Sequence, residues 1–358
     1  MANLIQKEEI GLTGARGLCC IYVFIYHIIT APSWFLTWEL NWSPFPYPYS
    51  NLHADFANPL QAGGAVGVDI FFLISGYILT KKWIRGDYRS YGSYMIKRIF
   101  RTWPMYYVGV LMYVLLGFAT LSVPLLFFAS NYFPQTFAQI GLWTLMIEEL
   151  FYLTLPTLLW LGFFRKNWKI ALITMLEASL FYRYFVVHFL SVQFNTSVVY
   201  LNGQILSFLF LYSMGIILGM GKSLQFGRYR FVIPIAFCLM VLATGDVIQT
   251  WWSPFIVAIM GYLIIANYEK SRFFTNRISV FYGKISYSFY LFSVLVGPLV
   301  VVFNRIFGGS LVNEPILTVA WLLTTIIAIT LLSYLAYTQI ERRFILFGRK
   351  LIYAEQTD

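Results

Sequence analysis

The chain has 358 residues, of which 59% are hydrophobic, 20% aromatic and 11% charged, and its formal net charge is +10. This composition excludes an ordinary soluble globular domain. Repeated apolar runs of about twenty residues, each long enough to cross about 30 Å of hydrocarbon, indicate instead a polytopic helical membrane protein. The cysteines lie in apolar runs without the spacing of a disulfide framework or a zinc site, so we expect no bound metal.

Ten apolar segments follow one another, and we expect each to form a transmembrane helix: 14–32, 64–80, 102–121, 143–164, 170–189, 201–221, 231–249, 253–268, 285–305 and 315–338. Of the 25 Lys and Arg residues, all except Arg183 and Arg305 fall on one side of these spans. The positive-inside rule then places both termini in the cytoplasm. The positive charge is therefore topological and does not indicate nucleic acid. The sequence predicts a single all-α membrane domain over residues 1–358.

The first span carries two ionisable side chains on one face. Residues 16–30 read RGLCCIYVFIYHIIT, and the steps from Arg16 to His27 make about three helical turns and about 16 Å of rise. Ionisable groups inside a membrane helix usually face a polar cavity, so both are functional candidates. The structural alternative is an Arg that extends to the membrane surface and a His that bonds a neighbouring helix. Cys20 shares the face of His27, so an acyl-cysteine relay is a further alternative.

Two segments between the spans differ in composition from the rest. Residues 32–63 are dense in Trp, Tyr, Pro and Asn and contain no Lys or Arg. Such a loop suits either sugar rings or the membrane interface. Residues 122–142 are short and interrupted by Pro, and we expect a re-entrant or surface segment there on the outer side.

The second span reads GVDIFFLISGYILT and places Asp69 at a depth comparable to that of His27. A carboxylate beside an imidazole fixes its tautomer and raises its basicity. Close helix packing is the plainer explanation for Ser75 and Gly76 in the same span.

The densest basic segment follows the second span and contains Lys81, Lys82, Arg85, Arg89, Lys97, Arg98 and Arg101. A cytoplasmic loop needs only about two or three charges to set its topology, so the excess invites a second explanation. Clustered Arg and Lys residues bind phosphate through charge-assisted hydrogen bonds. A phosphate-bearing cofactor, anionic lipid headgroups and plain topology remain the alternatives.

The fourth span opens with WTLMIEELFYLTLP and carries the adjacent carboxylates Glu148 and Glu149. Adjacent residues lie about 100° apart on a helix, so one can face a cavity while the other needs a different partner. His27, Asp69 and Glu148 lie in the outer half of the membrane, whereas the basic residues lie at its cytoplasmic edge. A long ligand with phosphates at one end and a reactive group at the other would bridge the two sets.

Taken in order, the motifs R-x10-H, GVDIFFLISGYILT, KRIFRTWPMYY, WTLMIEELFYLTLP, GKISYSFYLFS and ERRF resemble the acyltransferase 3 family of integral-membrane acyltransferases, over residues 16–344. The resemblance implies a bundle of about ten spans that uses acyl-CoA, commonly acetyl-CoA, from the cytoplasm. It implies a carbohydrate or lipid-linked sugar as acceptor, at the outer face of a bacterial cytoplasmic membrane. Arg16 and His27 match the R-x10-H pair, in which the His is essential.

Three departures from the family pattern bear on function. Thr144 replaces the Ser of the W-S-L-x-x-E motif, whose first Glu matches Glu148. Ser293 stands where many members have a His after the S-Y-x-x-Y-L motif, so we assign no second catalytic His there. The chain ends without the hydrolase-like domain that some members carry, and we expect a stand-alone membrane enzyme.

These residues suggest two separate roles, binding of the cofactor phosphates and catalysis. We expect the phosphates of acetyl-CoA to bind four cations at the cytoplasmic edge: Arg16, Lys97, Arg98 and Arg101. His27 would act as general base on the acceptor hydroxyl, oriented by Asp69 or Glu148, and an acyl-histidine intermediate is the alternative mechanism.

The alternative function is a proton-coupled transporter or flippase of a polar lipid or sugar, because intramembrane His, Asp and Glu also build proton relays. The sequence contains no inverted repeat of the kind that transporters show, which argues against it.

Overall fold

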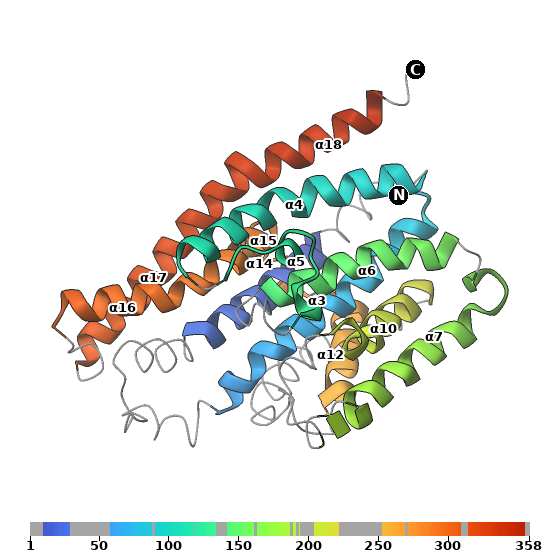
Figure 1. Ribbon diagram of the computed structural model, residues 1–358, viewed down its shortest axis with the longest axis horizontal. Helices are drawn as coiled ribbons and strands as arrows, with labels where there is room; N and C mark the ends of the chain where they lie inside the picture. Colours follow the sequence, from blue (N-terminus) through green and yellow to red (C-terminus); the bar gives the residue numbers. More distant parts are fainter. Residues whose placement is uncertain are drawn as a thin grey trace. The chain divides into compact units, whose positions relative to one another are not determined.

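The computed structural model describes residues 10–28, 58–87, 90–117, 119–133, 142–160, 163–186, 189–190, 193, 204–221, 253–268, 271–308 and 314–354. Every regular element in these ranges is a helix, which confirms the predicted all-α class for the described part of the chain (Figure 1). The chain divides into two compact units. The first comprises Met1–Ile70 and Gln225–Leu335, and the second comprises Phe71–Leu224 and Ala336–Asp358.

The first unit is built from the N-terminal helix and the helices before the C-terminal segment. These are Ile10–Ile28, the start of α3 (Asn58–Ile84), α12 (Ser253–Asn267), α13 (Arg272–Thr275), α14 (Arg277–Lys284), α15 (Ser286–Phe292), the 3-10 turn η6 (Ser293–Leu295), α16 (Val296–Ile306) and α17 (Pro315–Ala336). Asn276 caps α14, since its side chain accepts a hydrogen bond from the backbone N–H of Ser279 at 2.9 Å.

Small residues bring the N-terminal helix against α14 and α15. A Cβ atom at Gly283 would collide with the carbonyl oxygen of Thr13, and one at Gly17 would collide with the carbonyl oxygen of Ser279. Only glycine allows two helix backbones to approach so closely. These contacts place Gly283, the first residue of the motif GKISYSFYLFS, at a close helix crossing.

From this crossing the two segments run on in parallel. The thiol of Cys20 donates to the carbonyl oxygen of Ser286 at 3.4 Å, 266 positions later in the chain. One helical turn further along, the ring centroids of Phe24 and Phe289 lie 4.8 Å apart. Successive residues on one face of the N-terminal helix therefore meet successive residues of α15. We call this contact the parallel seam.

The second unit contains the end of α3 and the helices of the middle and the C-terminus. They are α4 (Tyr91–Leu115), α5 (Val123–Leu126), η2 (Ser130–Tyr132), α6 (Leu142–Trp160), α7 (Phe163–Phe181), η4 (Tyr182–Val186), η5 (Ile205–Ser207), α10 (Leu209–Met220), η7 (Tyr337–Glu341) and α18 (Arg342–Ala354). Helix α4 packs against α6 and α18, and α7 packs against α6 and α10 (Figure 1).

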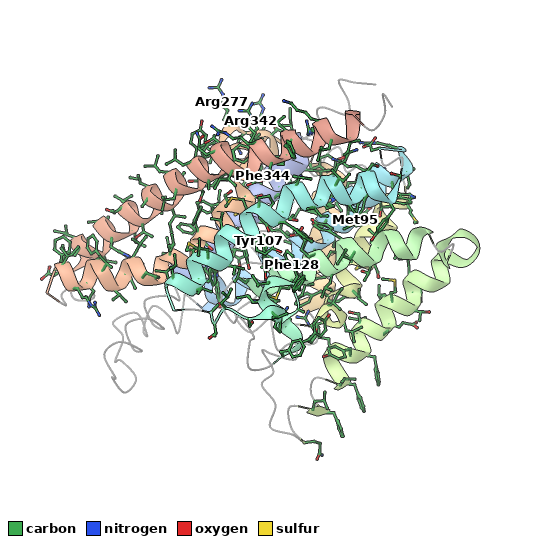
Figure 2. All side chains as sticks on the ribbon, turned by 45° about the horizontal axis from the view of Figure 1, so that its top comes forward. Met95, Tyr107, Phe128, Arg277, Arg342 and Phe344 are labelled. Atoms are coloured by element: carbon green, nitrogen blue, oxygen red, sulfur yellow. The ribbon has the colours of Figure 1, made fainter. Side chains whose placement is uncertain are left out.

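Glycines also set two crossings in this unit. A Cβ at Gly76 of α3 would lie 2.6 Å from the carbonyl oxygen of Tyr212 in α10, which confirms the close packing expected at Gly76. A Cβ at Gly348 of α18 would lie 2.7 Å from Cβ of Phe100 in α4. The ring of Phe344 stacks on that of Phe100 at 6.4 Å, and Figure 2 shows Phe344 on α18 above α4.

The segment between α4 and α6 folds back onto α4. Its residue Phe128 has a φ of 56°, in the left-handed region that non-glycine residues rarely adopt. In this conformation the Phe128 ring lies 4.0 Å from that of Tyr106 and 6.3 Å from that of Tyr107 on α4 (Figure 2). Residues 122–142 were expected to form a re-entrant or surface segment. Residues 122–133 form the short elements α5 and η2, and 134–141 lie outside the described residues.

Three helices in the described part of the chain are long and apolar enough to cross a membrane: Ile10–Ile28, Ser286–Ile306 and Ile316–Ile352. They coincide with three of the predicted spans and support a membrane protein. Helices α3, α4, α6, α7, α10 and α12 also overlap predicted spans. The predicted span at 231–249 and most of the aromatic loop 32–63 lie outside the described residues. The count of ten spans and the cytoplasmic termini stay predictions.

Candidate functional site

The parallel seam places a hydroxyl next to the imidazole of His27. Nδ1 of His27 lies 2.9 Å from Oγ of Ser293, at hydrogen-bond distance. This pair is again 266 positions apart, as Cys20 and Ser286 are, so it follows the register of the seam. The helix tightens from α to 3-10 at Ser293, where η6 begins. His27 is half-buried, and Nε2 makes no hydrogen bond with the described residues.

Asp69 and Arg16 belong to the same unit as His27. Asp69 is buried on α3, two residues after Gly67, where α3 contacts the N-terminal helix. A Cβ at Gly67 would lie 2.7 Å from the Val23 side chain and 3.0 Å from the carbonyl oxygen of Cys19. Arg16 is half-buried at the foot of the N-terminal helix. The orienting role that the sequence suggested for Asp69 stays a prediction.

Glu148 lies in the second unit and is held by one oxygen. Oγ of Ser75 on α3 donates to its Oε1 at 3.2 Å, and the hydroxyl of Tyr152, one turn along α6, donates to the same oxygen. Within the described residues these are its hydrogen bonds. Glu148 is half-buried, and its Oε2 makes no hydrogen bond with the described residues.

The neighbouring carboxylate has different partners. Glu149 is 4% exposed, and its Oε2 accepts a hydrogen bond from Nε1 of Trp103 on α4 at 3.2 Å. Thr102 also hydrogen-bonds this carboxylate, and Arg98 interacts with it electrostatically. The two adjacent carboxylates therefore turn to different neighbours, as their angular separation on the helix predicted. Glu149 joins α6 to α4, whereas Glu148 keeps an oxygen for other chemistry.

Arg98 lies between two tyrosine rings in the same interface. Its guanidinium carbon is 4.7 Å from the Tyr152 ring and 5.6 Å from the Tyr94 ring, and the side chain is 8% exposed. Tyr94 also donates to the carbonyl oxygen of Tyr152 at 3.0 Å. A cation over an aromatic face is attracted by the ring quadrupole. Arg98, Tyr152 and Glu148 thus form a connected series from a cation to a carboxylate, which we call the Arg–Tyr–Glu series.

The other predicted cations of α4 lie around this series. Lys97 is half-buried, and its Nζ donates to the carbonyl oxygen of Asp87 at 2.9 Å. Arg101 is half-buried one turn further along and interacts electrostatically with Tyr337 of η7. Arg342 and Arg349 of α18 interact with the same phenol. The C-terminal segment therefore brings further positive charge to the region of Arg101.

The arrangement offers two chemically different centres. In the first unit, a half-buried imidazole has one nitrogen held and the other available. In the second unit, the carboxylate of Glu148 has one oxygen held by hydrogen bonds, and one of its donors, Tyr152, also contacts the buried Arg98. In the described residues, no three His, Cys, Asp or Glu side chains gather as metal ligands would.

Sequence reasoning missed three of the residues that hold these groups. Ser293 was recognised only as a departure from a family motif and Ser75 only as a packing residue, because each is remote in sequence from its partner. Tyr152 was detectable, since it lies four residues after Glu148, and residues at that spacing are neighbours on a helix.

Comparison with known proteins places the chain among acyltransferases. The family described as "Acyltransferase domain" matches residues 9–338. The "Putative O-acetyltransferase SACOL0978" of Staphylococcus aureus (strain COL) is 26% identical over 341 residues, covering 80% of this chain and 50% of that protein. Nodulation protein 10 of Rhizobium leguminosarum bv. viciae is 30% identical over 133 residues, covering 29% of this chain and 35% of that protein.

A further relative is the peptidoglycan O-acetyltransferase OatA of Listeria monocytogenes serovar 1/2a. It is 26% identical over 180 residues, covering 43% of this chain and 24% of that protein. The chain spans half the length of the Staphylococcus relative, and no solved structure matches it. Because the family match extends over residues 9–338, the chain belongs to the acyltransferase 3 family of acyltransferase enzymes.

Proposed function

We propose that this protein transfers an acyl group, most simply acetyl, from cytoplasmic acyl-CoA to a hydroxyl of a carbohydrate or lipid-linked sugar. The acceptor would lie at the outer side of a bacterial cytoplasmic membrane. Family membership supports acyl transfer, and two of the relatives are named as a putative O-acetyltransferase and a peptidoglycan O-acetyltransferase. Peptidoglycan is the first carbohydrate to test, because one relative carries it in its name.

The Arg–Tyr–Glu series carries this proposal. The basic motif of α4 is the candidate for phosphate recognition, and Glu148 is the candidate for reaction chemistry. Tyr152 touches both, since its ring lies against Arg98 and its hydroxyl binds Glu148. The candidate phosphate-binding motif and the candidate reactive carboxylate therefore meet at one tyrosine side chain. Arg342 and Arg349 add to the positive potential that would attract the phosphates.

In the proposed reaction His27 is the general base. Its imidazole takes the proton of the acceptor hydroxyl while the hydroxyl oxygen bonds to the acyl carbonyl carbon. The thioester carbon–sulfur bond then breaks, and the proton passes to the departing thiolate. Asp69 or Glu148 would orient His27 and stabilise the imidazolium. Arg16, Lys97, Arg98 and Arg101 bind the CoA phosphates.

Binding of acetyl-CoA to the purified full chain in detergent tests the donor side. The test variant is the double substitution Lys97→Gln, Arg101→Gln, because both side chains are half-buried and accessible. The double substitution Arg272→Gln, Arg277→Gln, at exposed positions of α13 and α14 in the other unit, is the matched loss of two positive charges. We expect saturable binding that weakens at least tenfold in the Lys97→Gln, Arg101→Gln protein and is unchanged in the Arg272→Gln, Arg277→Gln protein. Folded protein that binds no acetyl-CoA would contradict the proposal and favour a transporter.

The acceptor side is tested by release of CoA from acetyl-CoA with soluble peptidoglycan fragments present. We expect release to depend on both the fragments and His27. Normal acetyl transfer by His27→Gln would contradict the assigned base.

A further inference from the structure

The hydroxyl of Ser293 makes two short polar contacts, and together they determine where its proton lies. Oγ is 2.6 Å from the carbonyl oxygen of Tyr290, three residues earlier, and 2.9 Å from Nδ1 of His27. A carbonyl oxygen carries no proton, so the first contact is a hydrogen bond only if the serine hydroxyl donates. A hydroxyl has one proton to give, and it is therefore engaged with Tyr290.

The same count of donors and acceptors shows which nitrogen of the imidazole carries the proton. Because the Ser293 proton points to Tyr290, its oxygen is an acceptor toward His27, and Nδ1 must donate. A neutral imidazole carries one N–H, so Nε2 is left with its lone pair. We propose that Ser293 is a positioning residue that holds His27 in the Nδ1–H tautomer and presents Nε2 as the base. This inference rests on the base role proposed for His27.

The surroundings of Ser293 hold its oxygen in place. Ser293 is 1% exposed and begins η6, and its backbone N–H bonds to the carbonyl oxygens of Phe289 and Tyr290. The contact of Phe24 with Phe289, one turn before, fixes the same seam. The serine oxygen can therefore move little relative to the imidazole. This gives Ser293 the place that an orienting acid has in other acyl-transfer enzymes, but with a neutral group.

A serine suits this position because its hydroxyl can accept a hydrogen bond without bringing a charge. A carboxylate there would accept from Nδ1 but would add a buried charge. A hydroxyl whose proton is already directed to a backbone carbonyl accepts from Nδ1 and adds none. An alanine would remove the acceptor and leave Nδ1 and Nε2 to share the proton without a preference set by the protein.

The tautomer is measured directly by 15N NMR of the full chain labelled at its three histidines in detergent. The His27 signals are assigned from their loss in His27→Gln. We expect the shift of a protonated nitrogen for Nδ1 and of an unprotonated nitrogen for Nε2 at a pH where the ring is neutral. The reverse pattern in the folded protein overturns the inference, and this measurement needs no variant of Ser293.

Whether Ser293 sets this tautomer is tested by the rate at which diethyl pyrocarbonate modifies His27. The rate is measured by mass spectrometry, with His53 and His188 as internal references. We expect Ser293→Ala to slow modification of His27 about fivefold, from the loss of one hydrogen bond that supports the lone pair on Nε2. Ser293→Thr, which keeps the hydroxyl, should restore the rate to within about twofold. Ser288→Ala on α15, also fully buried, is the matched control.

The direction of the effect separates positioning from packing. Loosened packing would expose His27 and speed its modification, so an unchanged or faster rate in Ser293→Ala overturns the inference. The readout requires neither acetyl-CoA nor an acceptor. If the protein turns over no acetyl-CoA while the tautomer and rates are as expected, the proposed function fails and the placement of the proton by Ser293 stands.

Discussion

Adjacent residues can serve different purposes when a helix turns them to different neighbours. Glu149 is enclosed between α6 and α4 and bonds to Trp103, so its carboxylate is used in packing. Glu148 shares one oxygen between Ser75 and Tyr152 and keeps the other. This difference depends on a rotation of about 100° between consecutive side chains.

Substitution of each carboxylate by its amide should therefore affect different quantities. We expect Glu148→Gln to lower acetyl-CoA turnover about a hundredfold, the usual contribution of a positioned acid or base, with little change in thermal stability. Glu149→Gln should instead destabilise by about 1–3 kcal/mol, the cost of an impaired buried hydrogen bond, and keep turnover within a few-fold. Turnover and the midpoint of thermal unfolding are measured on both variants. Equal effects of the two on turnover would contradict this assignment.

Tyr152 gives a second prediction at this scale. Tyr152→Phe keeps the ring against Arg98 but removes the hydrogen bond to Glu148, so we expect a fall in turnover of about fivefold at nearly unchanged binding of acetyl-CoA. Tyr106→Phe on α4 is the matched control, since its hydroxyl donates to the carbonyl oxygen of Leu125 at 2.6 Å. That variant should lose stability and keep turnover. A fall in acetyl-CoA binding by Tyr152→Phe would mean that the hydroxyl serves Arg98 instead.

The sequence was sufficient to identify the ionisable residues of the candidate site, but not the residues that hydrogen-bond to them. His27 and Glu148 are recognisable because an ionisable group within an apolar run is costly and so draws attention by itself. Ser293 and Ser75 are ordinary small residues in their own segments. They acquire a role only when helices that are remote in sequence pack together, and a single sequence does not show which helices do so. Asp69 was recognised in the same way as His27.

At the scale of elements, helix contacts made through glycine set the register of the parallel seam. Gly17 and Gly283 meet just before the seam, and Cys20, Phe24 and His27 follow on the same face of the N-terminal helix. The sequence predicted the helices and their approximate bounds from apolar length. It did not predict that the N-terminal helix and α15 would be parallel neighbours, since apolar faces do not specify a partner.

A larger residue at Gly283 should separate α14 from the N-terminal helix. We expect Gly283→Val to lower stability by about 1–3 kcal/mol or more, because its side chain would collide with the backbone of Thr13. Gly92→Ala on α4 is the control, since the nearest atom to a Cβ there is Oγ of Ser90 at 3.8 Å. Thermal unfolding of both in detergent makes the comparison. A Gly283→Val protein as stable as the wild type would mean that the helices separate without cost.

At the scale of the whole molecule, the long C-terminal helix bears on topology. The candidate span Ile316–Ile352 has 37 residues. At about 1.5 Å per residue it is far longer than the hydrocarbon core of about 30 Å, so part of it must extend beyond the membrane. Arg342, Arg343, Arg349 and Lys350 lie in its last turns. The positive-inside rule favours the cytoplasm for this end.

Labelling of single cysteines in whole cells tests that orientation. Lys350→Cys lies on the exposed side of α18, and Val123→Cys, at the exposed start of α5, marks the opposite predicted side. Cys238 is replaced by Ser, and the native Cys19 and Cys20 are buried. We expect a membrane-impermeant maleimide to label Val123→Cys in intact cells and Lys350→Cys only after permeabilisation. The opposite pattern would invert the predicted topology.

The constant register of the parallel seam has a consequence for chimeric proteins. The interval from Gly17 to His27 equals the interval from Gly283 to Ser293, so the two segments are matched in length although most of the chain separates them. If only one segment is grafted from a relative, the glycine crossing and the pair at positions 27 and 293 each combine one residue from each protein. Grafted together, they should transfer as one cassette, and a one-residue deletion in only one of them should be tolerated far less well than the same deletion made in both.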